Sequence, residues 1–354
     1  MEKNEKKRLV VFLAIAYGVT IVLNVLMYFG IQAGRDSSLL VQTQMTTPAC
    51  GVILGLLLYG NKDKKMPKAF FITYIAFSAI MLLVSIVNLF VEPTMIKTAS
   101  GEAPLLSVCF LYIIYAASVV VYILSWVCGK EKRANAGLSR NKVGLSIGLL
   151  VLFLVVFIAR FYISGLVSDN SSELIATYND LFTNIYLWRA VAIIAASFFI
   201  SFFTIFGEEY GWRYYLQPIL QNKFGKRLGI LILGVVWGLW HAGLDFMFYT
   251  RTSGPQMLVN QIVGCIGIAI FLGYVYMKTN NIWVVTLMHF LWDGLLQMIA
   301  PLISEDGSGI TNMDLKWSDI PAALICDIVL IVFIFAPIYG KKKKATMEQV
   351  EVVE

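Results

Sequence analysis

Long stretches of apolar residues recur along this chain, and they constrain its fold more than any other feature. A helix needs about 20 apolar residues to cross a hydrocarbon core roughly 30 Å thick, and lipid offers its backbone polar groups no external partner. Hydrophobic residues make up 58% of the 354 residues, and charged residues only 14%. We therefore expect an all-α, polytopic membrane helix bundle with about ten transmembrane helices, within a range of eight to ten. The predicted spans are 9–30, 46–60, 70–91, 105–128, 144–167, 190–214, 228–249, 257–277, 281–300 and 321–340.

Basic residues are concentrated in every second predicted loop. Lys and Arg accumulate in cytoplasmic loops of membrane proteins, so both termini are predicted to face the cytoplasm. The net charge of +6 requires no nucleic acid, because lysines beside anionic lipid account for it. The lipid bilayer is thus an expected partner, and nucleic acid is not. The basic residues on the predicted cytoplasmic side are Lys3, Lys6, Lys7, Arg8, Lys62, Lys64, Lys65, Lys68, Lys130, Lys132, Arg133, Arg140, Lys142, Lys223, Lys226, Arg227, Lys278 and Lys341 to Lys344.

The chain is predicted to form one membrane domain with four parts. Residues 1–180 supply N-terminal transmembrane helices with few polar residues, Arg160 being the clearest exception. Residues 181–300 hold most of the ionisable groups of interest, residues 301–340 an outer loop and the last transmembrane helix, and residues 341–354 a disordered cytoplasmic tail. The five cysteines are scattered and predict neither a disulfide framework nor a metal cluster.

Both histidines of the chain lie in strongly apolar segments. Ionisable side chains are costly inside hydrocarbon, and they mark functional sites there. Each histidine lies four residues from another distinctive side chain, and an acidic pair with an arginine precedes them. The residues concerned are Glu208, Glu209, Arg213, Trp237, His241, His289 and Asp293.

Helix geometry predicts that these groups lie at a similar depth. Glu208 and His241 are 15 and 14 residues from the basic residues that mark one predicted cytoplasmic loop, and His289 is 11 residues after Lys278. At 1.5 Å per residue, the first two lie roughly 20 Å from that loop. We therefore expect three helices to bring polar groups to one buried site.

The spacing within each motif predicts different roles for the side chains. Residues four apart share a helix face, so Glu209 is expected to pair with Arg213, while Glu208 is rotated by about 100° and stays without a cation. A carboxylate of that kind suits general acid or base chemistry. His289 and Asp293 share a face and are expected to point at a substrate carbonyl or a water.

Two further features lie on the helix of His241. Trp237 stacks one turn away and is expected to fix the orientation of His241. Gly234 and Gly238 have the spacing that lets membrane helices pack closely. Asp245, one turn beyond His241, would either orient that histidine or reach the outer interface.

These motifs, in this order, resemble those of a known family. Glu208-Glu209-x-x-x-Arg213, Trp237-x-x-x-His241 and His289-x-x-x-Asp293 look like the three signature motifs of the CPBP intramembrane proteases, the CAAX-protease and bacteriocin-processing group, also called the Abi family. The resemblance covers roughly residues 185–300. Trp237 stands where phenylalanine is common, and Asp293 stands where the prenyl-protein proteases carry asparagine. An ionised aspartate would repel an oxyanion, whereas asparagine or a protonated aspartate would donate a hydrogen bond to it.

The resemblance implies an enzyme that hydrolyses peptide bonds within the membrane, with residues 181–300 as the catalytic core. Glu208 would be the general base, helped by His241, while His289 and Asp293 would stabilise the oxyanion. Glu209 and Arg213 would support the first helix. No cofactor is favoured. In an older zinc interpretation of the family, the ligands would be Glu208, His241 and His289, a plausible donor set, but the chain lacks the His-Glu-x-x-His arrangement.

The substrate implied is a membrane-associated or lipid-modified peptide or protein. The charge pattern fits an integral protein of a bacterial plasma membrane whose active site is reached from the cytoplasmic side. The sequence assigns no oligomeric state. A non-catalytic membrane scaffold or a bacteriocin-immunity protein is the competing interpretation. A transporter is a third, but the polar groups are confined to one half of the chain, whereas transporter repeats place them in both.

Overall fold

The structure is a computed structural model that describes residues 3–99, 101–303 and 314–340. The chain folds almost entirely into helices, and the predicted disordered tail lies outside the described residues. The first part of the chain forms α1 (Lys3–Leu13), η1 (Ala14–Val19), α2 (Thr20–Gln32), α3 (Ser38–Gln44), α4 (Thr47–Tyr59), α5 (Lys68–Phe90), α6 (Leu105–Val127), α7 (Lys130–Asn135), α8 (Val143–Val167), α9 (Ser171–Thr183) and α10 (Ile185–Ser201). A short antiparallel hairpin, β1 (Met95–Thr98) and β2 (Gly101–Pro104), joins α5 to α6.

The second part contains the helices that carry the three motifs. Its elements are α11 (Phe203–Glu209), η2 (Tyr210–Leu216), α12 (Gln217–Phe224), α13 (Lys226–Trp240), α14 (Ala242–Leu244), η3 (Asp245–Tyr249), α15 (Gly254–Thr279), α16 (Ile282–Ile303), α17 (Asp319–Cys326), α18 (Ile328–Ile331), η4 (Val332–Phe335) and η5 (Pro337–Tyr339). Within the described residues, seven helices are long and apolar enough to cross a membrane, or up to nine if each of two bent helix pairs forms one span. The predicted polytopic helical bundle is confirmed.

The long helices are apolar on both faces, as expected for helices that contact lipid on one side. In α8 the inward face buries Phe153 and Phe157, which are each 2% exposed. The opposite face carries Ile147, Val151 and Val155 at intervals of four residues, and each of these side chains is more than half exposed. In water such a face would be unfavourable, so this exposure fits a hydrocarbon surrounding.

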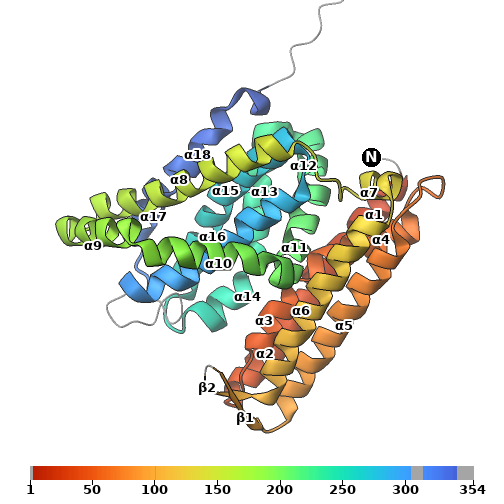
Figure 1. Cartoon of the computed structure of the whole chain (residues 1–354), viewed down its shortest axis with the longest axis horizontal. Coiled ribbons are helices and arrows are strands. Elements are labelled where there is room, and N and C mark those ends of the chain that lie inside the picture. The colour runs from red at the N-terminus through yellow and green to blue at the C-terminus, as the bar shows by residue number, and fades with distance from the viewer. Residues whose placement is uncertain (1–2, 100, 304–313, 341–354) are drawn as a thin grey trace, which may run out of the picture.

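The segment that carries the acidic pair lies at the centre of the molecule. Figure 1 shows α2 to α6 along one side and α8, α9, α17 and α18 on the other, with α11 between them. Helix α11 packs against α4, α6 and α16, and η2 packs against α4. Residues 202–213 are all buried. The helix of Glu208 and Glu209 is therefore a core element shared by both parts of the bundle.

The basic loops expected on one side of the membrane lie at one end of the molecule. Lys65 pairs with Glu131 at 3.1 Å, Lys142 Nζ donates to the carbonyl of Lys278 at 2.7 Å, and the N-terminus lies near α7 at the same end (Figure 1). These contacts join loops that are far apart in sequence. Whether this end faces the cytoplasm stays a prediction.

The predicted spans 190–214 and 321–340 differ from the structure. The first contains the end of α10 at Ser201 and the start of α11 at Phe203. The second divides into α17, α18 and two turns of 3-10 helix, and it is absent from the candidate spans of the described residues. The break falls at Asp327, whose Oδ1 accepts from Arg160 Nε at 2.6 Å. This ion pair also explains why Arg160 is tolerated in an apolar helix.

Candidate active site

Two small residues allow the helix of Glu208 to contact α4 closely. A Cβ added at Gly207 would overlap the backbone of Met45 and Thr46, and one added at Gly211 would overlap Pro48. The sequence analysis did not single out this pair, although Gly207-x-x-x-Gly211 has the small-residue spacing of close membrane helix packing. Gly234 and Gly238 behave similarly, because a Cβ on either would overlap α15. Their predicted packing role is confirmed.

Glu209 is buried and engaged on both sides. Its Oε2 lies 3.3 Å from Arg213 Nε, as the four-residue spacing predicts. Its Oε1 lies 2.8 Å from Nδ1 of His289 on α16. A carboxylate oxygen only accepts, so this imidazole nitrogen carries the proton. Glu209 thus joins the first motif to the third, which the spacing alone did not predict.

Glu208 makes a different contact. It is 2% exposed, and its Oε2 accepts a hydrogen bond of 2.8 Å from Trp237 Nε1. No basic residue in the described part of the chain forms a salt bridge with it. The prediction that one glutamate is neutralised by arginine and the other lacks a cation agrees with these contacts.

Trp237 is the centre of the arrangement. Besides its bond to Glu208, its ring lies 4.5 Å from Arg213 Cζ and its centroid lies 5.3 Å from that of His289 in an edge-on geometry. Its carbonyl lies 3.0 Å from Nδ1 of His241. One side chain on α13 therefore contacts residues of η2, α11 and α16. The two rings of Trp237 and His241 are tilted by 53° with centroids 6.0 Å apart rather than stacked, and it is the backbone carbonyl of Trp237 that contacts His241.

His241 is held in a defined tautomer. The carbonyl of Trp237 can only accept, so Nδ1 of His241 carries a proton and donates to it. In the neutral ring, Nε2 is then the basic nitrogen. Cys265 Sγ lies 4.0 Å from Nδ1, and the Trp240 ring packs edge-on at 4.9 Å. His241 is thus fixed with one nitrogen available for proton transfer.

His289 and Asp293 lie on the same face of α16, as predicted. Their Nε2 and Oδ2 atoms are 3.7 Å apart, which is too long for a direct hydrogen bond. The Asp293 side chain is 34% exposed, whereas that of His289 is 6% exposed. Asp293 therefore marks the more open side of the cluster.

Asp245 is fully buried, which excludes the alternative that it reaches the outer interface. Its backbone N–H donates to the carbonyl of His241 at 3.0 Å. Within the described residues, neither carboxyl oxygen has a hydrogen-bond partner. The side chain thus does not hold His241 in place by a hydrogen bond.

The zinc alternative requires at least three donor side chains that converge on one point. In the described part of the chain, no group of three or more His, Cys, Asp and Glu side chains is placed to hold a metal ion. Both histidines use Nδ1 for protein contacts, which leaves Nε2 for another ligand, a pattern also found in zinc-binding histidines. What is missing among the described residues is the convergence of Glu208, His241 and His289 on one point. Metal independence stays a prediction.

The comparisons with known proteins add to this geometry. Residues 189–295 match a family model described as type II CAAX prenyl endopeptidase Rce1-like. The match confirms the resemblance to the CPBP family. Its limits are close to the 185–300 expected from the motifs, and all three CPBP motifs lie inside it. No curated protein and no solved structure matched the chain. With the apolar helices, the CPBP match identifies an integral membrane protein with a protease-like segment.

Proposed function

We propose that the protein is an intramembrane endopeptidase of the CPBP type. It would hydrolyse a peptide bond of a membrane-associated or lipid-modified peptide or protein, without a metal. The observation that carries the proposal is the division of labour between the two glutamates. Glu209 is bound by Arg213 and His289, whereas Glu208 accepts from an indole and has no salt-bridge partner among the described residues.

In the proposed reaction, the Glu208 carboxylate accepts a proton from water while the water oxygen bonds to the carbonyl carbon of the substrate. Nε2 of His241 accepts a hydrogen bond from the other water proton and aligns the nucleophile. His289 acts as an imidazolium, which keeps one proton on Nδ1 for Glu209 and donates the other from Nε2 to the oxyanion. Asp293, as a neutral acid, donates to the same oxyanion. Glu208 then gives its proton to the amide nitrogen, and the carbon–nitrogen bond breaks.

The partners proposed are the bilayer and a substrate segment that reaches the site beside Asp293, its most exposed member. We further propose a bacterial plasma membrane and a site open to the cytoplasm, which is consistent with the basic loops that meet at one end of the molecule. Both the membrane and the orientation are inferred from the distribution of Lys and Arg among the loops.

The test uses purified protein in proteoliposomes and a panel of membrane-associated peptides, with cleavage followed by mass spectrometry. Glu208→Ala and His241→Ala should abolish cleavage, while Glu102→Gln on the exposed hairpin should leave it unchanged. Cleavage unaffected by either site variant would overturn the assigned base. Absence of cleavage by every form would favour a scaffold or immunity protein. Loss of activity on chelation, restored by zinc, would favour the metal mechanism.

A further inference from the structure

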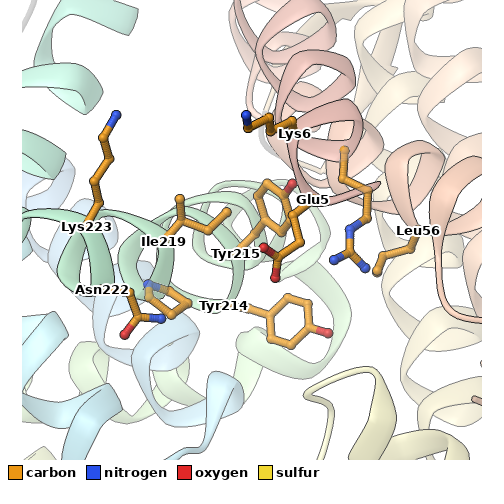
Figure 2. Close-up of a pocket in the computed structure, with 10 residues that line it drawn as sticks. Glu5, Lys6, Leu56, Tyr214, Tyr215, Ile219, Asn222 and Lys223 are labelled. Carbon is orange, nitrogen blue, oxygen red and sulfur yellow. The ribbon is translucent and has the colours of Figure 1, made fainter. Parts of the chain in front are cut away.

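A second feature of the molecule lies away from the catalytic cluster. A cavity of about 690 Å³ opens where the start of α1, the end of α4 and the η2–α12 segment meet (Figure 2). None of the proposed catalytic residues lines it. Its lining residues are Glu5, Lys6, Arg8, Leu56, Tyr214, Tyr215, Pro218, Ile219, Asn222 and Lys223.

The cavity is positively charged. Lys6, Arg8 and Lys223 supply three cations, and Glu5 is the one acid in the lining. Figure 2 shows Lys223 and Lys6 apart from one another, with Ile219 and Tyr215 between them in this view. Arginine and lysine in such a cluster are the residues that bind phosphate groups.

Two polar groups of the lining residues have no hydrogen-bond partner among the described residues. The Nε of Arg8 and the hydroxyl of Tyr215 are buried atoms, and in the described part of the chain neither has a hydrogen-bond partner. Buried donors of this kind are costly unless something binds them. Both belong to residues of the cavity lining. Because these two atoms are buried, it is the charges of the lining residues Lys6, Arg8 and Lys223 that would attract an acceptor.

The remaining lining is apolar. Leu56, Pro218 and Ile219 contribute aliphatic surface, and Tyr214 and Tyr215 contribute rings. Tyrosine is enriched at the level of lipid headgroups. The cavity also lies at the end of the bundle where the basic loops gather, because its walls include the first turns of α1 and the end of α12. A ligand with a phosphate and an apolar portion fits this composition.

We propose that this cavity binds an anionic phospholipid, with its phosphate against Lys6, Arg8 and Lys223 and the start of its acyl chains against the aliphatic wall. Basic pockets between membrane helices bind acidic headgroups in this way. The inference does not depend on catalysis, because it concerns binding at a different set of residues. A lipid there would bridge α1 to α12, and α12 directly follows the η2 turn that holds Arg213.

The test measures binding of phosphatidylglycerol to the purified full-length protein by native mass spectrometry. Phosphatidylcholine serves as the zwitterionic comparison, and glycerol phosphate as the soluble phosphate. Lys6→Gln/Lys223→Gln removes two cations from the cavity. Lys64→Gln/Lys132→Gln is the matched control, since these lysines are exposed at the same end and do not line the cavity.

The cavity variant should bind phosphatidylglycerol roughly thirtyfold more weakly, as expected for two basic residues near an anionic headgroup. The control should differ from wild type by less than about threefold. A second variant, Arg8→Lys, keeps the charge but removes the fork of donors and should weaken binding by roughly tenfold. Circular dichroism in detergent verifies that each variant is folded.

Three outcomes would overturn the inference. Equal affinity for phosphatidylglycerol and phosphatidylcholine would show that the cavity does not select an anionic headgroup. Equal losses in the cavity and control variants would assign the binding to general surface charge. Full displacement of the lipid by glycerol phosphate at the same concentration would assign the site to a soluble phosphate.

Discussion

Replacing Trp237 with phenylalanine tests how the base is held. The substitution keeps an aromatic ring between Arg213 and His289 but removes the indole N–H that donates to Glu208 Oε2 at 2.8 Å. A hydrogen bond to a charged group contributes about 1.5–3 kcal/mol. Without this bond the carboxylate is no longer held in line with the water, and a barrier higher by this amount corresponds to a roughly 10- to 150-fold lower kcat. KM should change little, because the indole does not contact substrate in the proposed reaction.

The assay is steady-state cleavage of a membrane peptide in proteoliposomes, with kcat and KM determined separately. Trp283→Phe is the matched control. Its buried indole donates to the carbonyl of Leu138 at 2.8 Å, away from Glu208 and His241. The control should lose stability but retain kcat. Equal losses of kcat in both variants, or an unchanged kcat in Trp237→Phe, would refute the positioning role.

Three further predictions concern the surroundings of the site. Asp293→Asn should retain activity within about threefold, because an amide still donates to the oxyanion, whereas Asp293→Ala should lose roughly 10²–10³-fold; an inactive Asn variant in the cleavage assay would contradict this role. Gly211→Ala should destabilise the protein by about 1–3 kcal/mol, because the added Cβ overlaps α4. Gly148→Ala is the control and should not destabilise it, because its Cβ would face open space. Equal melting temperatures for the two variants would contradict the close packing at Gly211. Asp327→Ala should lower the free energy of unfolding by about 3 kcal/mol, because it leaves Arg160 unpaired. Chemical denaturation measures this change, and an unchanged free energy of unfolding would mean that the pair is not stabilising.

Contacts within one helix were predictable from the sequence. The four-residue spacing predicted the pair Glu209–Arg213 and placed His289 on the same face as Asp293. Apolar segment lengths predicted the helical bundle. These inferences work because they depend on helix periodicity, which the sequence contains directly.

Contacts between helices were not predictable in the same way. The bond from Trp237 to Glu208 and that from His289 to Glu209 join residues 29 and 80 positions apart. Their geometry depends on how α11, α13 and α16 cross, and no local pattern encodes that. The same holds for Arg160 and Asp327, which lie 167 positions apart. Arg160 stood out in the sequence as a polar residue in an apolar segment, but Asp327 did not, and their pairing required the fold.

The most direct test of the central claim compares peptide cleavage by wild type and Glu208→Gln in proteoliposomes, with thermal unfolding measured on the same samples. Glutamine keeps the shape and the hydrogen bond to Trp237 but cannot accept the proton of water. The account predicts an unchanged melting temperature and a kcat lower by at least roughly 10²–10⁴-fold. A folded Glu208→Gln protein that cleaves the peptide at the wild-type rate would contradict it.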